Sequence, residues 1–342
     1  LYLKDKIANT LYFMENFPMV AKTFFGFEEI LEKELQILGA TQIQKGVRSV
    51  SFSGDKGFMY KANLCLRTAL KILKPIHSFR VRNEKDYYQK LYQYDWEQLL
   101  SPTQTFAVEV TLATDLFHHS QYMTLRAKDA IVDKLRATTG KRPNVDTLHP
   151  DMQLFIHIQS DNQVIVSLDT SGASLHHRGY RTQTNIAPIN EVLAAGILLL
   201  SGWKGQSDFL DPMCGSGTFL IEAAMIACNI PASLHRKEFA FEKWADYDVD
   251  LFETIFDSSL AKAKEFNYHL YGYDKAPSAV TKAKENIKNA RLTEYITVSQ
   301  QDFFKTKKEK ETSLFMAFNP PYGERLEINP QLFYSQIGNT LK

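Results

Sequence analysis

The stretch Asp211-Pro212-Met213-Cys214-Gly215-Ser216-Gly217-Thr218 decides the fold of the C-terminal half of the chain. It follows the apolar pair Phe209-Leu210, as expected after a buried strand, and precedes a helix-forming run from Phe219 to Ala227. The sequence therefore predicts a strand, a glycine turn and a helix. The two glycines let the chain bend sharply and leave room for a ligand against bare amides, at the positive end of the helix. Such a corner binds a nucleotide-like cofactor.

The residues around the glycines distinguish between classes of cofactor. A dinucleotide fingerprint has a third glycine where this chain has Leu220, and the Lys and Ser or Thr of a P-loop are missing. NAD and ATP are therefore disfavoured. An acidic residue at the strand end with two close glycines is similar to the corner of S-adenosylmethionine-dependent methyltransferases, although a tight turn of any doubly wound domain is the alternative. On that resemblance we expect the cofactor to contact Asp211, Pro212, Cys214, Gly215, Ser216, Gly217 and Thr218.

A second motif, Asn319-Pro320-Pro321-Tyr322, follows an apolar run at residues 314–318 that predicts a central parallel strand. Proline has no amide hydrogen and fixes its own φ, so the Asn319 side chain and the Pro320 carbonyl are held as acceptors at the carboxyl edge of the sheet. Open α/β sheets bind their ligands at that edge. An exocyclic base amine would find two acceptors there and an aromatic face in Tyr322. We predict these four residues to be catalytic, and an Asn-Pro turn with a core tyrosine is the alternative.

Together the two motifs resemble the amino-methylating methyltransferases. With the preceding half, the chain is similar to the THUMP-containing ribosomal RNA guanine-N2 methyltransferases, over roughly residues 17 to 342. Further residues that carry the resemblance are Arg142 to Asp146, Leu175 to Arg181 and Ala187 to Glu191. The resemblance implies an α/β fold. It consists of a Rossmann-like class I S-adenosylmethionine-dependent methyltransferase domain preceded by an α+β region with a ferredoxin-like unit and a THUMP RNA-binding domain.

The expected organisation has five parts: an extension at residues 1–16, a ferredoxin-like unit at 17–75, a THUMP domain at 76–172, a linker at 173–190 and the methyltransferase domain at 191–342. Within the first unit we predict a helix from Lys56 to about Lys71. In the second, residues 154–158 and 164–168 are expected to pair across a turn. We count four of the seven strands of a complete methyltransferase sheet, so we expect the last domain to be incomplete at its C-terminus.

Other cofactor contacts are expected at later strand ends. Asp274 comes 63 residues after Asp211 (274 minus 211), and an insertion at about residues 231–266 explains this long separation. Its carboxylate can accept hydrogen bonds from both ribose hydroxyls. For this region of the cofactor we predict contacts from Asp274, Lys275, Asp302 and Phe303, with Asp302 on the adenine amino group and Phe303 against the ring; helix capping is the alternative role of both acids. The family resemblance adds Ala187 and Pro188, for which a helix entry with proline in its first turn is the alternative.

Composition limits the other possibilities. The three cysteines have neither the number nor the spacing of a zinc cluster or a disulfide framework, and the adjacent His pairs cannot place both rings on one face, so no metal is expected. Three cysteines without such a pattern fit a reducing, cytoplasmic setting. No apolar run approaches the roughly 20 residues of a membrane helix, so no membrane partner is expected.

An RNA partner has weak support from charge. The chain holds 40 Lys and Arg against 39 Asp and Glu, so any basic surface must come from arrangement. The THUMP domain of the family holds structured RNA, which is read mainly through backbone and shape. We predict RNA contacts at Tyr122, Arg126, Lys128 and Lys141, and an ordinary solvated surface is the alternative.

The resemblance implies methyl transfer from S-adenosylmethionine to the exocyclic N2 of a guanosine in large-subunit (23S) ribosomal RNA, with S-adenosylhomocysteine as product. The motif alone serves adenine N6 and cytosine N4 equally, so a DNA adenine methyltransferase is the leading alternative, followed by a transfer RNA guanine-N2 methyltransferase. A ribosome assembly factor that binds RNA without catalysis is the alternative that is not an enzyme.

Overall fold

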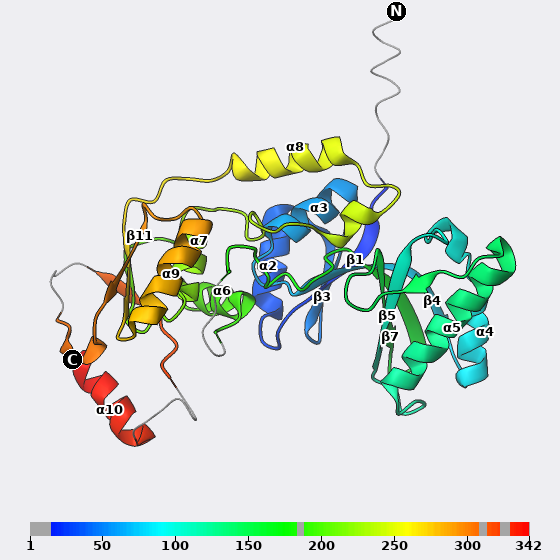
Figure 1. The fold of residues 1–342 in the computed structure, drawn as a ribbon, viewed down its shortest axis with the longest axis horizontal. Helices are drawn as coiled ribbons and strands as arrows, with labels where there is room; N and C mark the ends of the chain where they lie inside the picture. The colour runs from blue at the N-terminus through cyan, green and yellow to red at the C-terminus, as the bar shows by residue number, and fades with distance from the viewer. Residues whose placement is uncertain (1–14, 183–187, 308–312, 322–328, 342) are drawn as a thin grey trace, which may run out of the picture.

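The structure is a computed structural model that describes residues 15–182, 188–307, 313–321 and 329–341. Three regions lie in a row along its long axis (Figure 1): the small sheet with α7 and α9, a central region with α2 and α3, and a third region with α4 and α5. The predicted extension at residues 1–16 falls almost entirely outside the described residues.

The central region and the third region share one sheet of eight strands, in the order β2-β3-β1-β4-β8-β7-β5-β6. We call this sheet and its helices the N-terminal module. The predicted pairing of residues 154–158 with 164–168 is confirmed, because β7 and β8 are antiparallel and Leu154 lies opposite Leu168. The strands are β1 Phe17–Lys22, β2 Thr41–Gly46, β3 Ser49–Gly54, β4 Lys71–Arg80, β5 Thr105–Leu112, β6 Asn144–Val145, β7 Met152–Ile158 and β8 Gln163–Asp169.

Strand β4 runs across the expected boundary at residue 75. It pairs with β1 only from Lys71 to Leu73, and on its other side it pairs with β8 as far as Arg80. Pro75 lies beyond the last residue paired with β1, and the register with β8 shifts between Pro75 and His77. Proline is tolerated in a sheet at such irregular positions. The strand therefore loses its partner β1 before Pro75 and continues in the sheet beside β8.

The helices of the N-terminal module are α2 Glu28–Leu38, α3 Lys56–Cys65, α4 Glu84–Gln93 and α5 Ser120–Thr139, with a short 3₁₀ helix η1 at Trp96–Gln98. The prediction that α3 continues to about Lys71 is wrong. The carboxylate of Glu34 accepts hydrogen bonds from the amides of Arg67 and Thr68, at 2.9 and 3.0 Å, and from the Thr68 hydroxyl. These contacts from α2 draw the chain out of the helix, although Leu66 to Leu70 are all compatible with one.

The predicted methyltransferase domain has a parallel sheet in the order β11-β10-β9-β12. Its strands are β9 Asp208–Asp211, β10 Leu270–Asp274, β11 Ile296–Gln300 and β12 Leu314–Met316, which confirms the four predicted strands. The helices are α6 Glu191–Leu200, α7 Thr218–Ala227, α9 Pro277–Asn289 and α10 Pro330–Leu341, with the 3₁₀ turn η3 at Phe303–Lys305. Helices α7 and α9 pack against the strands, and their buried side chains belong to the same hydrophobic core as Phe209 and Leu220.

The insertion between α7 and β10 packs back on the N-terminal module. It contains η2 at Ala240–Lys243 and α8 at Val249–Leu260, and α8 lies along α3 (Figure 1). Phe239, Phe241 and Trp244 are buried in the hydrophobic core of the N-terminal module. The ring of Phe241 is 4.5 Å, centroid to centroid, from that of Tyr60 on α3. A segment of the second half of the chain therefore completes the core of the first.

Candidate active site

The two predicted motifs meet at one edge of the small sheet. Strands β9 and β12 are neighbours and parallel, with Leu210 opposite Met316, and the Ala317 amide donates to the Leu210 carbonyl at 3.3 Å. Asp211 begins the glycine turn on one strand, and Asn319 follows three residues after Met316 on the other. Because both strands run in the same direction, both motifs lie at the carboxyl edge. The structure thus meets the geometric condition for a cofactor and an acceptor base to come together.

Residues 211–218, which we call the cofactor corner, have the predicted strand, turn and helix. Gly217 caps α7 with a φ of 83°, a left-handed conformation that favours glycine, and its amide donates to the Cys214 carbonyl at 2.8 Å. A Cβ atom at this position would lie 3.4 Å from the Cβ of Ala283 on α9. Glycine therefore allows both the bend and the close packing of the corner on α9.

Asp274 ties the cofactor corner to β10. Its Oδ2 accepts from the Gly215 amide at 3.0 Å and its Oδ1 from the Ala276 amide at 2.9 Å. The glycine amides thus have partners within the protein, so the corner offers space and shape rather than the bare amides expected from the sequence. Each carboxylate oxygen has a second lone pair, so Asp274 keeps acceptor capacity for ribose hydroxyls. The exposed Lys275 follows it directly.

Burial controls the protonation of two residues of the corner. Burial raises the pKa of Asp211 to about 8, and the nearby Asp274 carboxylate adds to the shift, while the hydrogen bond from the Met213 amide opposes it. Burial also raises the pKa of the Cys214 thiol, so this thiol stays protonated. At neutral pH the Asp211 carboxyl is therefore largely uncharged and can both donate and accept a hydrogen bond, which suits a cofactor that carries hydroxyl and amino groups. Cys214 has the character of a packing residue.

The remaining predicted cofactor contacts are distributed around this edge. Asp302 caps η3, accepting from the Phe304 amide at 3.1 Å. Phe303 is buried in a small cluster with Phe333 and Ile337 of α10, and its ring centroid is 5.9 Å from that of Phe318, beside Asn319. Because Phe303 follows β11 and Phe318 follows β12, this contact brings the chain after β11 close to the chain after β12. Adenine recognition by Asp302 and Phe303 stays a prediction.

The sequence motifs extend into parts of the chain that are only partly described. Asn319, Pro320 and Pro321 are half-buried, and so is Pro188, which lies two residues before the Asn190 cap of α6. Tyr322 and Ala187 lie outside the described residues.

Two residues that support the corner were not predicted as site residues. The Asn286 side chain of α9, which is 0% exposed, donates to the Ser216 carbonyl at 3.0 Å. Arg181 donates to the Thr218 hydroxyl at 2.7 Å. Asn286 was detectable as a polar residue among the apolar positions of α9, whereas the role of Arg181 depends on a tertiary contact.

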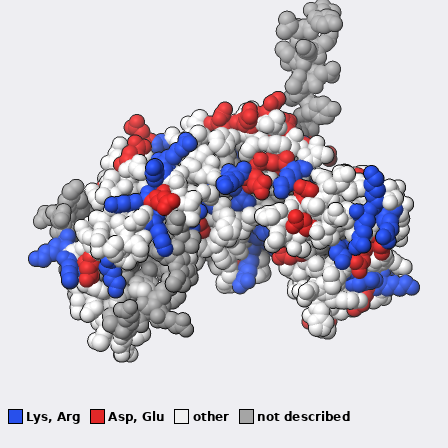
Figure 2. Space-filling model, viewed as in Figure 1, with Lys and Arg blue, Asp and Glu red and all other residues white. Residues whose placement is uncertain are grey.

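The predicted RNA-binding residues do not form a single cluster. Tyr122 and Arg126 lie one turn apart on α5, next to α4; the Tyr122 hydroxyl donates to Glu84 at 3.0 Å and the Arg126 guanidinium lies 4.7 Å from the Tyr88 ring centroid. Lys128 pairs with Asp129 at 3.3 Å, and Lys141 is exposed beyond the far end of the helix. Figure 2 shows basic side chains gathered over this region, with acidic ones among them.

Within the described ranges, no group of three or more His, Cys, Asp or Glu side chains is arranged to hold a metal ion. In the same part of the chain, every helix is too short or too polar to span a bilayer.

Three family models match the chain in succession. They are the RlmL ferredoxin-like domain at residues 18–73, the THUMP domain at 81–169 and the RMKL-like methyltransferase domain at 178–342. The chain is 39% identical over 331 residues to the ribosomal RNA large subunit methyltransferase K/L of Cellvibrio japonicus. That match covers 93% of this chain but spans only 44% of the relative's length.

Solved structures share the whole architecture. SMU.472, a putative methyltransferase in complex with S-adenosylhomocysteine (SAH), has a TM-score of 0.83 and a sequence identity of 32% to this chain. A possible methylase from Clostridium difficile 630 has a TM-score of 0.83 and a sequence identity of 31%. A predicted N6-adenine-specific DNA methylase from Listeria monocytogenes strain 4b F2365 has 0.84 and 29%. Each match covers 96% of this chain and 86% of the other. The chain therefore belongs to the family of S-adenosylmethionine-dependent methyltransferases in which an RlmL-type ferredoxin-like domain and a THUMP domain precede an RMKL-like methyltransferase domain.

Proposed function

We propose that this chain methylates the exocyclic N2 amine of a guanosine in large-subunit ribosomal RNA. The observation that carries the proposal is the pairing of β9 with β12, which brings the cofactor corner and Asn319 to one edge of the sheet. The name of the Cellvibrio relative supports ribosomal RNA as the polymer, and the THUMP match supports an RNA substrate.

The cofactor supplies an electrophilic methyl group on a sulfonium. In this proposal the protein contributes mainly orientation, because the N2 lone pair is conjugated with the guanine ring and the amine is a weak nucleophile. The Asn319 side-chain oxygen and the Pro320 carbonyl accept the hydrogens of the amine. These two acceptors also stabilise the positive charge that develops on the nitrogen during transfer. Tyr322 would stack on a base turned out of its helix.

The two acceptors serve adenine N6 as well, and the similarity to the predicted DNA methylase from Listeria favours testing that alternative first. The purified chain is incubated with methyl-labelled S-adenosylmethionine and three substrates: unmodified large-subunit ribosomal RNA, transfer RNA and duplex DNA. Mass spectrometry of the nucleosides identifies the product.

We expect N2-methylguanosine in the ribosomal RNA. N6-methyladenine found only in duplex DNA would contradict the proposal, and so would N2-methylguanosine found only in transfer RNA. Calorimetry with SAH distinguishes an enzyme from the alternative that is not an enzyme. A chain that binds RNA but does not bind SAH would be an assembly factor. The Asn319→Ala variant provides the background rate, since it removes one acceptor without touching the cofactor corner.

A further inference from the structure

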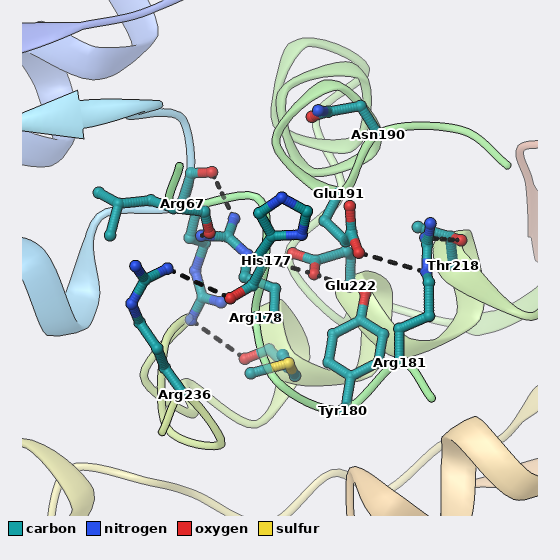
Figure 3. Close-up of polar contacts among 12 residues, drawn as sticks. Arg67, His177, Arg178, Tyr180, Arg181, Asn190, Glu191, Thr218, Glu222 and Arg236 are labelled. Carbon is teal, nitrogen blue, oxygen red and sulfur yellow. Dashed lines mark hydrogen bonds and ion pairs between the residues drawn. The ribbon is translucent and has the colours of Figure 1, made fainter. Parts of the chain in front are cut away.

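A short segment of the linker runs alongside α7, the helix that begins at the cofactor corner. We call residues 178–181, Arg-Gly-Tyr-Arg, the linking segment. Gly179 has a φ of 99°, and a Cβ atom there would lie 1.9 Å from the His235 carbonyl oxygen. The segment is therefore held tightly against the insertion. Figure 3 shows its three long side chains directed toward residues of α6, α7 and the N-terminal module.

Two of these side chains hold the middle of α7. The Tyr180 hydroxyl donates to Glu222 Oε1 at 3.0 Å, and Arg178 Nε is 3.5 Å from the same oxygen, with both charged side chains 0% exposed. Arg178 Nη2 also donates to the Arg67 carbonyl at 2.6 Å. Arg67 in turn donates to the Ile230 carbonyl just beyond the helix, at 2.7 Å. The body of α7 is thereby fixed to the N-terminal module (Figure 3).

The third side chain, Arg181, reaches the start of α7. Its Nη2 donates to the Thr218 hydroxyl at 2.7 Å and to the Ile189 carbonyl at 3.2 Å. Its Nε lies 3.2 Å from Glu191 Oε1, at the first residue of α6. The Arg181 and Glu191 side chains are 13% and 4% exposed. Arg181 therefore joins the last residue of the cofactor corner to the beginning of α6.

The corner depends on such external support because its own turn contains two glycines and few side chains that could fix its shape. A small displacement of the first turn of α7 would move the backbone against which the cofactor packs. Hydrogen bonds from a charged donor are among the stronger ones in proteins, and a largely buried guanidinium with several partners has little freedom to move. We propose that Arg181 is a positioning residue for the cofactor, acting through Thr218 to hold the corner in its binding shape.

The test is a double-mutant cycle in SAH affinity, measured by calorimetry on the full chain. Arg181→Met removes the charged donor and keeps much of the side-chain volume, and Thr218→Val removes the acceptor at nearly constant shape. Each single variant is expected to bind SAH about tenfold more weakly, which corresponds to about 1.4 kcal/mol. The double variant is expected to lose little more than either single variant, because both remove the same interaction.

Tyr180→Phe is the matched control. It removes a buried hydrogen bond to the same helix, at Glu222, one turn from Thr218. It is expected to lower the melting temperature and to leave SAH affinity within about twofold of the wild type, since its contact is not at the corner. If Arg181→Met does not fold, Arg181→Gln takes its place in the cycle, because it also removes the charge and shortens the reach to the Thr218 hydroxyl. Three results would overturn the proposal: wild-type SAH affinity in either corner variant, a loss of about a hundredfold in the double variant, or an equal loss in Tyr180→Phe.

Discussion

Replacing Phe241 by alanine is expected to detach the insertion from the N-terminal module. The Phe241 side chain is 0% exposed, and its ring centroid lies 4.5 Å from Tyr60, 5.1 Å from Phe239 and 5.4 Å from Phe252. A fully buried phenylalanine leaves a cavity that rigid neighbours fill only in part, so its truncation costs about 3–5 kcal/mol. Three aromatic neighbours from α3 and the insertion place this substitution near the upper end of that range.

The free energy of unfolding is measured by urea denaturation, followed by far-UV circular dichroism and by tryptophan fluorescence. Trp244 belongs to the same core, so it contributes to this signal together with Trp96 and Trp203. Phe256→Ala is the control, because Phe256 is half-buried near the end of α8, with its ring centroid 6.4 Å from that of Phe252. It is expected to cost about 1 kcal/mol. A loss for Phe241→Ala no larger than that of the control would refute the inference that the insertion is anchored through this core.

Three further results are expected. Gly217→Ala forces a left-handed φ on an L residue at a cost of about 1–2 kcal/mol, so both stability and SAH affinity should fall; unchanged SAH affinity in calorimetry would contradict the role of the corner. Burial raises the pKa of Asp211 from 3.8 to about 8 and that of Glu191 from 4.5 to about 7. The folded state therefore binds these protons more tightly than the unfolded state, and the melting temperature should fall as pH rises from about 4 to 8, less steeply in Asp211→Asn; a melting temperature with the same pH dependence in Asp211→Asn as in the wild type would contradict the shift at Asp211. Lys141→Ala should weaken RNA binding in filter assays and lower the salt dependence by about one counterion, whereas an unchanged salt slope would remove Lys141 from the RNA surface.

The methyltransferase strands and the cofactor corner could be predicted because their signals are local. A short apolar run followed by Asp211 and two glycines fixes a strand, a turn and a helix without reference to the rest of the chain. The same holds for the existence of β12, because its apolar run comes just before the two prolines, although the strand ends at Met316 and not at the predicted residue 318. Parallel pairing then places both motifs at one edge.

Contacts between distant segments could not be predicted in this way. Hydropathy marks Arg67 and Arg178 as surface residues, yet Arg178 is 1% exposed because Glu222 and the Arg67 carbonyl lie against it. The end of α3 at Cys65 depends on Glu34 of another helix, and it overrides the helix propensity of the following residues. The core that Phe241 enters could not be predicted either, because its partner Tyr60 lies far away in the sequence.

Whether the cofactor and the acceptor base meet above the ends of β9 and β12 is tested most directly in the Asn319→Ala variant, by measuring SAH affinity and methyl transfer to large-subunit ribosomal RNA in the same preparation. Binding is expected to stay within about twofold of the wild type, while transfer falls by about a hundredfold or more, because one preorganised acceptor for the reacting amine is lost. Transfer at the wild-type rate, or a loss of SAH binding equal to the loss of transfer, would contradict the placement of donor and acceptor on neighbouring strands.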